Sequence, residues 1–370
     1  MKIKWLIPAL LMAFALTAAA CGSDTEEETS TDAETTEEEA STEEAETSEE
    51  EAEASEEEAM EEGAEASDLE TLNVAYFLEW PTPNQFEQST GAYAEQMGLE
   101  VNWVPFNTGV EMSAAMASGD IDIAFSQGLV PFVGAVSAGQ DLRLVDIAVS
   151  YAENDNCVAR TDLGITRDNA TDLDGATVAV PLGTVAHYKM LKSMQYMGVD
   201  TDSFNIVNLD PAEGAAALQG GDVDMACGWG GGLQRMLEAG NILMTGAEME
   251  DEIGLKVFDV TSVRGDFADE YGSVVSQFLA ITAESNLAYA ADPASRIDAI
   301  ASEAGMSVED AESSLSTFSF PTVEEQLGDS WLNGDVPTFM NEVADLFVAE
   351  GALESKLDDY AATIDTSFLE

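Results

Sequence analysis

Ten residues of this chain have the chemistry to bind a small charged molecule. Hydroxyl groups and main-chain N–H groups at helix starts hold anions, and carboxylates or aromatic faces hold ammonium groups. Two segments that each precede a predicted helix supply such N–H groups and a hydroxyl: Ser126-Gln127-Gly128 and Thr184-Val185-Ala186-His187. The full set of candidates is Glu79, Trp80, Ser126, Gln127, Gly128, Thr184, His187, Trp229, Gly230 and Asp259.

Most of these candidates also fit a structural role. Trp80 and Trp229 suit core positions in which the indole N–H is satisfied, and Ser126 and Gln127 suit a helix cap. Both interpretations stay open for each residue.

The charged candidates differ in how strongly their surroundings favour a ligand. Glu79 suits a solvated loop charge, and His187, the only histidine, suits a position packed behind a pocket. Asp259 lies in the apolar stretch Val257-Phe258-Asp259-Val260, where a lone carboxylate needs a partner. Asp259 is therefore the first choice for meeting a ligand ammonium, and Glu79 the second.

Two similar segments, 102 positions apart, must position these candidates. Residues 114–125 and 216–227 share an apolar helix end, a Gly-Asp turn, an alternating strand and a polar or glycine-rich loop. Residues 73–76 resemble residues 177–180 at nearly the same offset. Two copies of so long a repeat predict two similar α/β lobes and not a solenoid. The turn acids Asp120, Asp122, Asp222 and Asp224 are interpreted as structural.

Hydrophobic periodicity predicts alternating strands and helices in both lobes. The first lobe has strands at 72–78, 101–106, 121–125 and 142–149, with helices at 85–97 and 109–117. The second has strands at 157–160, 178–181, 204–209 and 223–227, with helices at 185–197 and 211–218. A strand at 255–263 returns to the first lobe, and the chain is helical after 284. This order predicts a mainly parallel sheet flanked by helices in each lobe, with the candidate loops facing one cleft.

The amino terminus predicts export and anchoring. Lys2 and Lys4 precede an apolar run of 12 residues, and small residues lead to Cys21. Residues 1–21 therefore resemble a lipoprotein signal peptide with Cys21 as the lipidated residue, although an ordinary secretory signal with an incidental cysteine stays open. Residues 22–70 contain 24 acidic residues and no basic ones, which predicts a disordered acidic tether. We expect lobe 1 at 71–152, lobe 2 at 153–262, and a return to lobe 1 with C-terminal helices at 263–370.

Charge and cysteine content exclude several classes of function. From Thr71 onward the chain carries 49 acidic and 10 basic residues, which argues against nucleic acid as a partner and suggests a saline environment. Cys157 and Cys227 lie outside the cytosol, so a disulfide and two buried thiols are both open. One histidine and two cysteines at these spacings fit no zinc or iron site, and we expect no metal and no cofactor.

Several segments resemble one family. Ser118–Ala124, Thr177–Pro181, His187-Tyr188, Val207-Asn208-Leu209 and Gly221–Asp224 are similar to the taurine-binding proteins of ABC importers, within the nitrate/sulfonate/taurine group. The resemblance covers about 300 residues and implies a two-lobe periplasmic binding protein fold of type II with the ligand in the cleft. One departure is Gly228-Trp229-Gly230-Gly231-Gly232, where relatives carry bulkier residues, which predicts a wider pocket.

The resemblance implies an extracytoplasmic protein, not an enzyme, that binds taurine or a close small sulfonate and delivers it to an ABC permease. We expect the protein in the periplasm or on the outer face of the cell membrane, as a monomer held by its lipid anchor. Alternatives within the class are an alkanesulfonate, nitrate or another small organic anion or zwitterion. A ligand sensor for a receptor is a further alternative, and an enzyme related to the pyrimidine-synthesising members of the group has only His187, Cys157 and Cys227 available.

Overall fold

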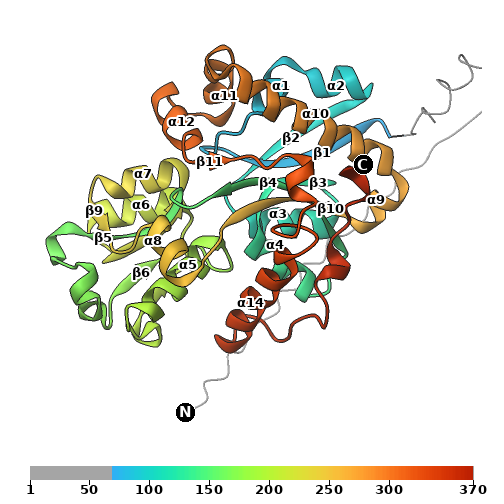
Figure 1. Cartoon of the computed structure of the whole chain (residues 1–370). Coiled ribbons are helices and arrows are strands. Elements are labelled where there is room, and N and C mark those ends of the chain that lie inside the picture. The colour runs from blue at the N-terminus through green and yellow to red at the C-terminus, as the bar shows by residue number, and fades with distance from the viewer. Residues whose placement is uncertain (1–68, 370) are drawn as a thin grey trace, which may run out of the picture. The chain divides into compact units, whose positions relative to one another are not determined.

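Residues 69–369 are described by the computed structural model, and they form two lobes with one sheet each (Figure 1). The predicted signal peptide, Cys21 and nearly all of the acidic tether lie outside the described residues. Within residues 69–369, no helix is both long enough and apolar enough to cross a membrane.

The first lobe contains a six-stranded sheet in the order β11-β4-β10-β3-β1-β2. Strands β1 to β4 run in one direction, and β10 and β11 run against them. Its strands are β1 (Thr71–Phe77), β2 (Glu100–Phe106), β3 (Ile123–Gly128), β4 (Leu142–Tyr151), β10 (Phe258–Arg264) and β11 (Phe318–Ser319).

The second lobe contains a five-stranded sheet in the order β7-β6-β8-β5-β9. Here β5 runs against the other four strands. Its strands are β5 (Asp155–Arg160), β6 (Thr177–Ala179), β7 (Asn205–Val207), β8 (Met225–Trp229) and β9 (Gly240–Ile242).

Helices cover both faces of each sheet, because successive strand residues point to opposite faces. On β1, for example, Leu72 and Val74 pack with α10, while Ala75 and Phe77 join the core that contains α4 and α14. The helices of the first lobe are α1 (Gln85–Thr90), α2 (Ala92–Met97), α3 (Gly109–Ser118), α4 (Leu129–Ser137), α9 (Gly265–Glu270), α10 (Gly272–Ala291), α11 (Ile297–Ala304), α12 (Val308–Leu315), α13 (Val323–Gln326) and α14 (Asp335–Ala349). Those of the second are α5 (Val185–Tyr196), α6 (Pro211–Gly220), α7 (Gly230–Leu237) and α8 (Gly246–Ile253).

Both lobes have the expected α/β sheet flanked by helices, and each sheet is mixed. Each lobe keeps four strands in one direction, as the βαβ alternation predicts. However, the strand that arrives from the other lobe inserts antiparallel between two of them: β5 lies between β8 and β9, and β10 between β3 and β4. Because β10 begins at Phe258, the chain returns to the first sheet before the expected boundary at 262/263.

Several element boundaries differ from the predicted ones for local reasons. The helix expected at 85–97 is divided at Gly91, which has the left-handed φ of 74° that ends α1. Strand β3 continues through Gly128, so Ser126 to Gly128 form a strand end and not a loop. The strand expected after 255 is not the last one, because the short β11 follows it on the edge of the first sheet.

The repeat predicted from the sequence is visible in matching hydrogen bonds. Asp122 Oδ2 accepts from the backbone N–H of Asn73 at 2.9 Å, and Asp224 Oδ2 accepts from that of Thr177 at 2.9 Å. The first bond joins β1 to the residue that precedes β3, and the second joins β6 to the residue that precedes β8. These aspartates are therefore structural, as their repetition suggested.

Candidate ligand-binding site

A cavity lies between the two lobes, where strand ends and helix starts meet. It has about 310 Å³ of empty volume, including the part open to solvent. It is lined by Phe77, Trp80, Gly109, Gly128, Pro131, Tyr151 and Asp259 from the first lobe and by Asp155, Thr184, Val185 and Trp229 from the second.

Half of the ten predicted residues line this cavity, and they come from both lobes. Trp80, Gly128 and Asp259 belong to the first lobe, and Thr184 and Trp229 to the second. The loops expected to face each other across a cleft thus do contribute Gly128 and Trp229 to one space.

A hydrogen-bonded chain fixes one wall of the cavity. The Trp80 indole N–H donates to Ser126 Oγ at 3.0 Å, and Ser126 Oγ donates to Asp259 Oδ2 at 2.8 Å. The Tyr151 hydroxyl donates to Asp259 Oδ1 at 2.9 Å, and its ring packs edge-on against Trp80 at 4.9 Å. Ser126 holds its place with a φ of 57°, which is unusual for a residue other than glycine. Ser126 therefore supports the wall from behind instead of lining the cavity.

Two buried carboxylates face the cavity. Asp259 is 3% exposed, and burial raises its pKa to about 8 although Ser126 and Tyr151 donate to it. Asp155 is 2% exposed, and burial raises its pKa to about 7 against the opposing effect of the Lys189 ammonium. Both groups therefore favour a cationic partner when they are ionised.

The first turns of three helices meet at the cavity. Gly109 begins α3, Gly128 is the N-cap of α4, and Thr184 is the N-cap of α5. Thr184 Oγ1 donates to the carbonyl of Pro181 at 2.6 Å and accepts from the N–H of His187, whereas no side chain caps α4. Among the residues that the structure describes, no lysine or arginine lines the space. An anion here would meet main-chain N–H groups and helix dipoles.

Glu79 and Gly230 lie outside the cavity, at a contact between the lobes. The Glu79 carboxylate accepts from Arg235 Nη1 at 2.8 Å and from Nη2 at 2.9 Å, so it pairs with α7 of the other lobe. Gly230 lies against the backbone of Glu79, and a Cβ at this position would be only 2.1 Å from the Glu79 carbonyl oxygen. At Gly232 a Cβ would lie 2.6 Å from Pro211. The glycines therefore permit close packing at this contact, and Gly230, Gly231 and Gly232 do not line the cavity.

Gln127 and His187 are buried behind the cavity. The Gln127 amide donates to the carbonyl of Gly109 at 2.8 Å and accepts from Ser262 Oγ at 2.7 Å, so it ties α3 to β10. His187 Nδ1 accepts from the N–H of Gly183 at 3.2 Å, the ring packs against Phe347, and burial lowers its pKa to about 4. His187 is thus neutral at physiological pH and occupies the structural position that the sequence left open.

Six lining residues were not among the candidates, and Tyr151 and Asp155 are the polar ones. They stand where the chain crosses from β4 to β5, in the polar stretch Tyr151–Asn156. The repeat contains a signal for Asp155, because it precedes Asp259 by 104 positions, the offset between Asn73 and Thr177. The others, Phe77, Gly109, Pro131 and Val185, belong to apolar segments that resemble any core.

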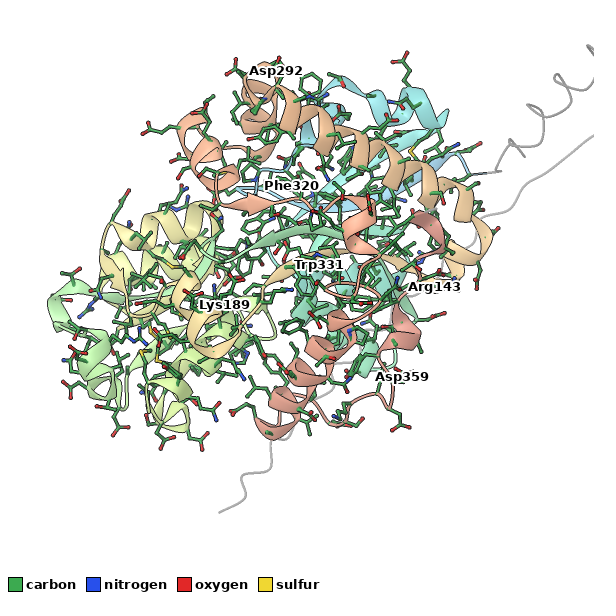
Figure 2. The ribbon with its side chains drawn as sticks, in the orientation of Figure 1. Arg143, Lys189, Asp292, Phe320, Trp331 and Asp359 are labelled. Atoms are coloured by element: carbon green, nitrogen blue, oxygen red, sulfur yellow. A yellow bond between two sulfur atoms is a disulfide. The ribbon has the colours of Figure 1, made fainter. Side chains whose placement is uncertain are left out.

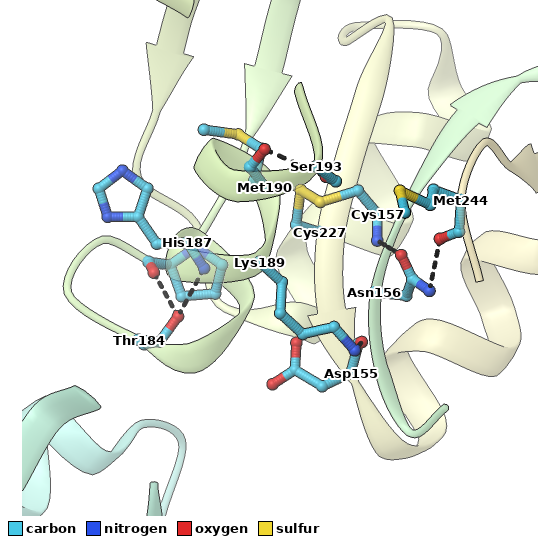
Figure 3. Close-up of a disulfide and its surroundings, with 11 residues drawn as sticks. Asp155, Asn156, Cys157, Thr184, His187, Lys189, Met190, Ser193, Cys227 and Met244 are labelled. Carbon is cyan, nitrogen blue, oxygen red and sulfur yellow. Dashed lines mark hydrogen bonds between the residues drawn. A yellow bond between two sulfur atoms is a disulfide. The ribbon is translucent and has the colours of Figure 1, made fainter. Parts of the chain in front are cut away.

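The cysteines stand directly behind the cavity in the second lobe. Cys157 and Cys227 are bonded to each other across the antiparallel pair β5 and β8. Asp155 and Trp229 face each other two residues further along the same two strands. The disulfide thereby holds together the two strands that carry these lining residues (Figure 3).

Comparisons with known proteins agree on the architecture. A family model described as "NMT1/THI5 like" matches residues 86–296. The taurine-binding periplasmic protein of Escherichia coli (strain K12) is 26% identical over 294 residues, which are 78% of this chain and 89% of that protein. The alkanesulfonate-binding protein of Xanthomonas axonopodis pv. citri, solved with bound MOPS, superposes with a TM-score of 0.67 at 20% identity over 82% of this chain and 100% of that one. The periplasmic aliphatic sulphonate binding protein of Escherichia coli gives 0.62 at 22% identity over 78% and 95%. These likenesses confirm the expected α/β two-lobe fold of periplasmic binding proteins.

Proposed function

Because the chain belongs to the NMT1/THI5-like family, we propose that it is the extracytoplasmic substrate-binding protein of an ABC importer, and that its ligand is taurine or a close small sulfonate. The relatives named for taurine and for alkanesulfonates support this class of ligand. The observation that carries the proposal is one small cavity that combines helix N-termini with buried carboxylates and aromatic rings.

Taurine matches the two chemistries of this cavity. Its sulfonate stays ionised at all physiological pH values and suits the N–H groups that begin α3, α4 and α5. Its ammonium lies two carbons away and suits a carboxylate next to indole and phenol rings, as at Asp259, Trp80 and Tyr151.

Capture follows from contacts to both lobes. A ligand between Gly128 of one lobe and Thr184 of the other favours the closed arrangement, because it binds that arrangement better than an open one. The closed protein then delivers the ligand to the permease. In this role the protein binds and releases its ligand without changing it.

Calorimetric titration with taurine, ethanesulfonate, longer alkanesulfonates, nitrate and glycine betaine tests the ligand class. We expect taurine to bind most tightly and nitrate to bind weakly or not at all. Tight binding of nitrate or glycine betaine without binding of any sulfonate would refute the proposal.

We also propose that Cys21 is lipidated and that residues 22–70 connect the anchor to the lobes. Cys21 and residues 22–68 lie outside the described residues, so both features are supported by the sequence alone. Cys21→Ser should release the protein from the membrane fraction, and deletion of residues 22–70 should leave taurine affinity unchanged. Retention of the variant in the membrane would contradict the lipid anchor.

A further inference from the structure

The two carboxylates of the cavity are counterparts in the internal repeat. Asp155 opens β5 and Asp259 is the second residue of β10, and these are the strands that cross into each lobe. The two positions are 104 apart, and so are Arg160 and Arg264, which end the same strands. Each lobe thus contributes one aspartate from an equivalent place.

The two aspartates are paired in equivalent ways with a neighbouring strand, and both therefore line the cavity between the lobes. Asp155 lies opposite Trp229 at the end of β8, and Asp259 lies opposite Gly128 at the end of β3. All four residues line the cavity. The aspartates are nearly inaccessible to solvent, so a group that enters the cavity meets one carboxylate from each lobe.

The two carboxylates differ in how far the protein satisfies them. Both oxygens of Asp259 accept a hydrogen bond, from Ser126 and from Tyr151. Asp155 Oδ1 is buried and has no hydrogen-bond partner among the described residues. A buried acceptor without a donor is unfavourable, and more so when it is charged. Asp155 is therefore the carboxylate with unused capacity for a ligand donor.

The nearest cation does not use this capacity. Lys189, fully buried in the second lobe (Figure 2), donates through Nζ to the carbonyl oxygens of Ala152, at 2.7 Å, and of Asp155. Figure 3 shows its ammonium at the backbone of Asp155 while the carboxylate extends away. Lys189 thus fixes the position of Asp155 and leaves the carboxylate free.

We propose that Asp155 is a specificity residue of the site: together with Asp259 it forms an ammonium subsite to which each lobe contributes one carboxylate, and its free oxygen accepts directly from the ligand. This inference rests on the proposed function and names the part of the ligand that the subsite selects. A primary ammonium has three N–H donors, whereas a quaternary ammonium has none and leaves Asp155 Oδ1 unsatisfied. The site therefore selects a primary amine over its trimethylated analogue.

The same arrangement couples ligand binding to protons. The groups that face the carboxylates are Tyr151 from β4, Ser126 from β3 and Lys189 from α5. Burial raises the pKa of Asp155 to about 7 and that of Asp259 to about 8, so the empty site holds a proton at neutral pH. A ligand ammonium favours the ionised carboxylates and displaces this proton.

Calorimetric titration of the wild-type protein and of Asp155→Asn with taurine, N,N,N-trimethyltaurine and ethanesulfonate tests the subsite. Asp155→Asn should weaken taurine by about tenfold to a hundredfold, and ethanesulfonate, which lacks the ammonium, should change by less than about twofold. Trimethyltaurine should bind the wild-type protein more weakly than taurine by a similar factor. Glu153→Gln is the matched control, because this carboxylate accepts from Gly246 and Ala247 outside the cavity.

Unchanged taurine affinity in Asp155→Asn, while the wild-type protein binds sulfonates, would overturn this inference and leave the proposed function intact. A wild-type protein that binds no sulfonate would overturn both. Should Asp155→Asn fail to fold, titration of the wild-type protein in buffers of different ionisation enthalpy decides the question. Taurine should release protons at neutral pH and ethanesulfonate should not; equal proton exchange by the two ligands would refute the subsite.

Discussion

Asp259→Asn should stabilise the ligand-free protein at alkaline pH and have little effect in acid. The Asp259 side chain is 3% exposed, and burial is the largest cause of its raised pKa. Asparagine keeps the shape of the side chain and resembles the protonated acid in charge. The substitution therefore removes the unfavourable ionisation of a buried group.

The size of the effect follows from the pKa. The value rises from 3.8 in the unfolded chain to about 8 in the folded one, a difference of about four pH units. At 1.36 kcal/mol per unit, ionisation lowers the free energy of unfolding by at most about 6 kcal/mol. Because the folded state binds this proton more tightly, the loss is absent below about pH 4, grows as the pH rises, and is complete above about pH 8.

Urea denaturation without ligand measures this difference at about pH 5 and about pH 8. Wild-type stability should fall between these values by up to about 4 kcal/mol more than that of Asp259→Asn. Asp251→Asn, at an exposed position of α8, is the control and should follow the wild type at both pH values. Equal destabilisation of Asp259→Asn at both pH values would show that its bonds with Ser126 and Tyr151 outweigh the burial of its charge, and would refute this reasoning.

Three further perturbations test the contacts around the cavity. Arg235→Gln breaks the interlobe pair with Glu79; because both side chains are about 40% exposed, ligand affinity should fall only about twofold to fivefold, and a loss of a hundredfold in titration would contradict this view. Gly230→Ala should weaken the ligand by more than about tenfold, because a Cβ would lie 2.1 Å from the Glu79 carbonyl oxygen at the contact between the lobes. It should also lower the melting temperature of the ligand-free protein, because alanine is strained at the left-handed φ of 51° that Gly230 adopts. Unchanged affinity would exclude this contact as part of closure. Reduction of Cys157–Cys227, which closes a loop over a separation of 70 residues, should lower stability by about 2–4 kcal/mol in urea denaturation, and an unchanged midpoint would contradict a structural role.

Local signals in the sequence predicted much of the fold. The two Gly-Asp turns located both lobes. The spacings Ser307/Asp310 and Thr322/Glu325 are typical of helix starts, and both threonine and serine are N-terminal caps in the structure. Such features depend on residues a few positions apart. The insertion of β5 and β10 against the direction of their neighbours depends on pairing across long separations, and for that reason the periodicity missed it.

The candidate site was harder to predict, because a side chain's direction is decided far along the chain. The Glu79 carboxylate binds Arg235, which is 156 positions away, and therefore does not line the cavity. Asp155 stands in a stretch of polar residues that resembles a surface loop, and only its pairing with β8 buries it. Asp259 was recognisable because apolar neighbours surround it in the sequence.

The Lys189 ammonium determines which lobe the crossing segment at Ala152 and Asp155 belongs to when the lobes separate. By holding the carbonyls of Ala152 and Asp155, it makes the crossing segment a rigid part of the second lobe, so that Asp155 travels with α5. Asp259 is held by Ser126 and Tyr151 and travels with the first lobe. Opening thus moves the two carboxylates apart. When both are ionised, their repulsion favours the open protein, and a cation bound between them removes that repulsion.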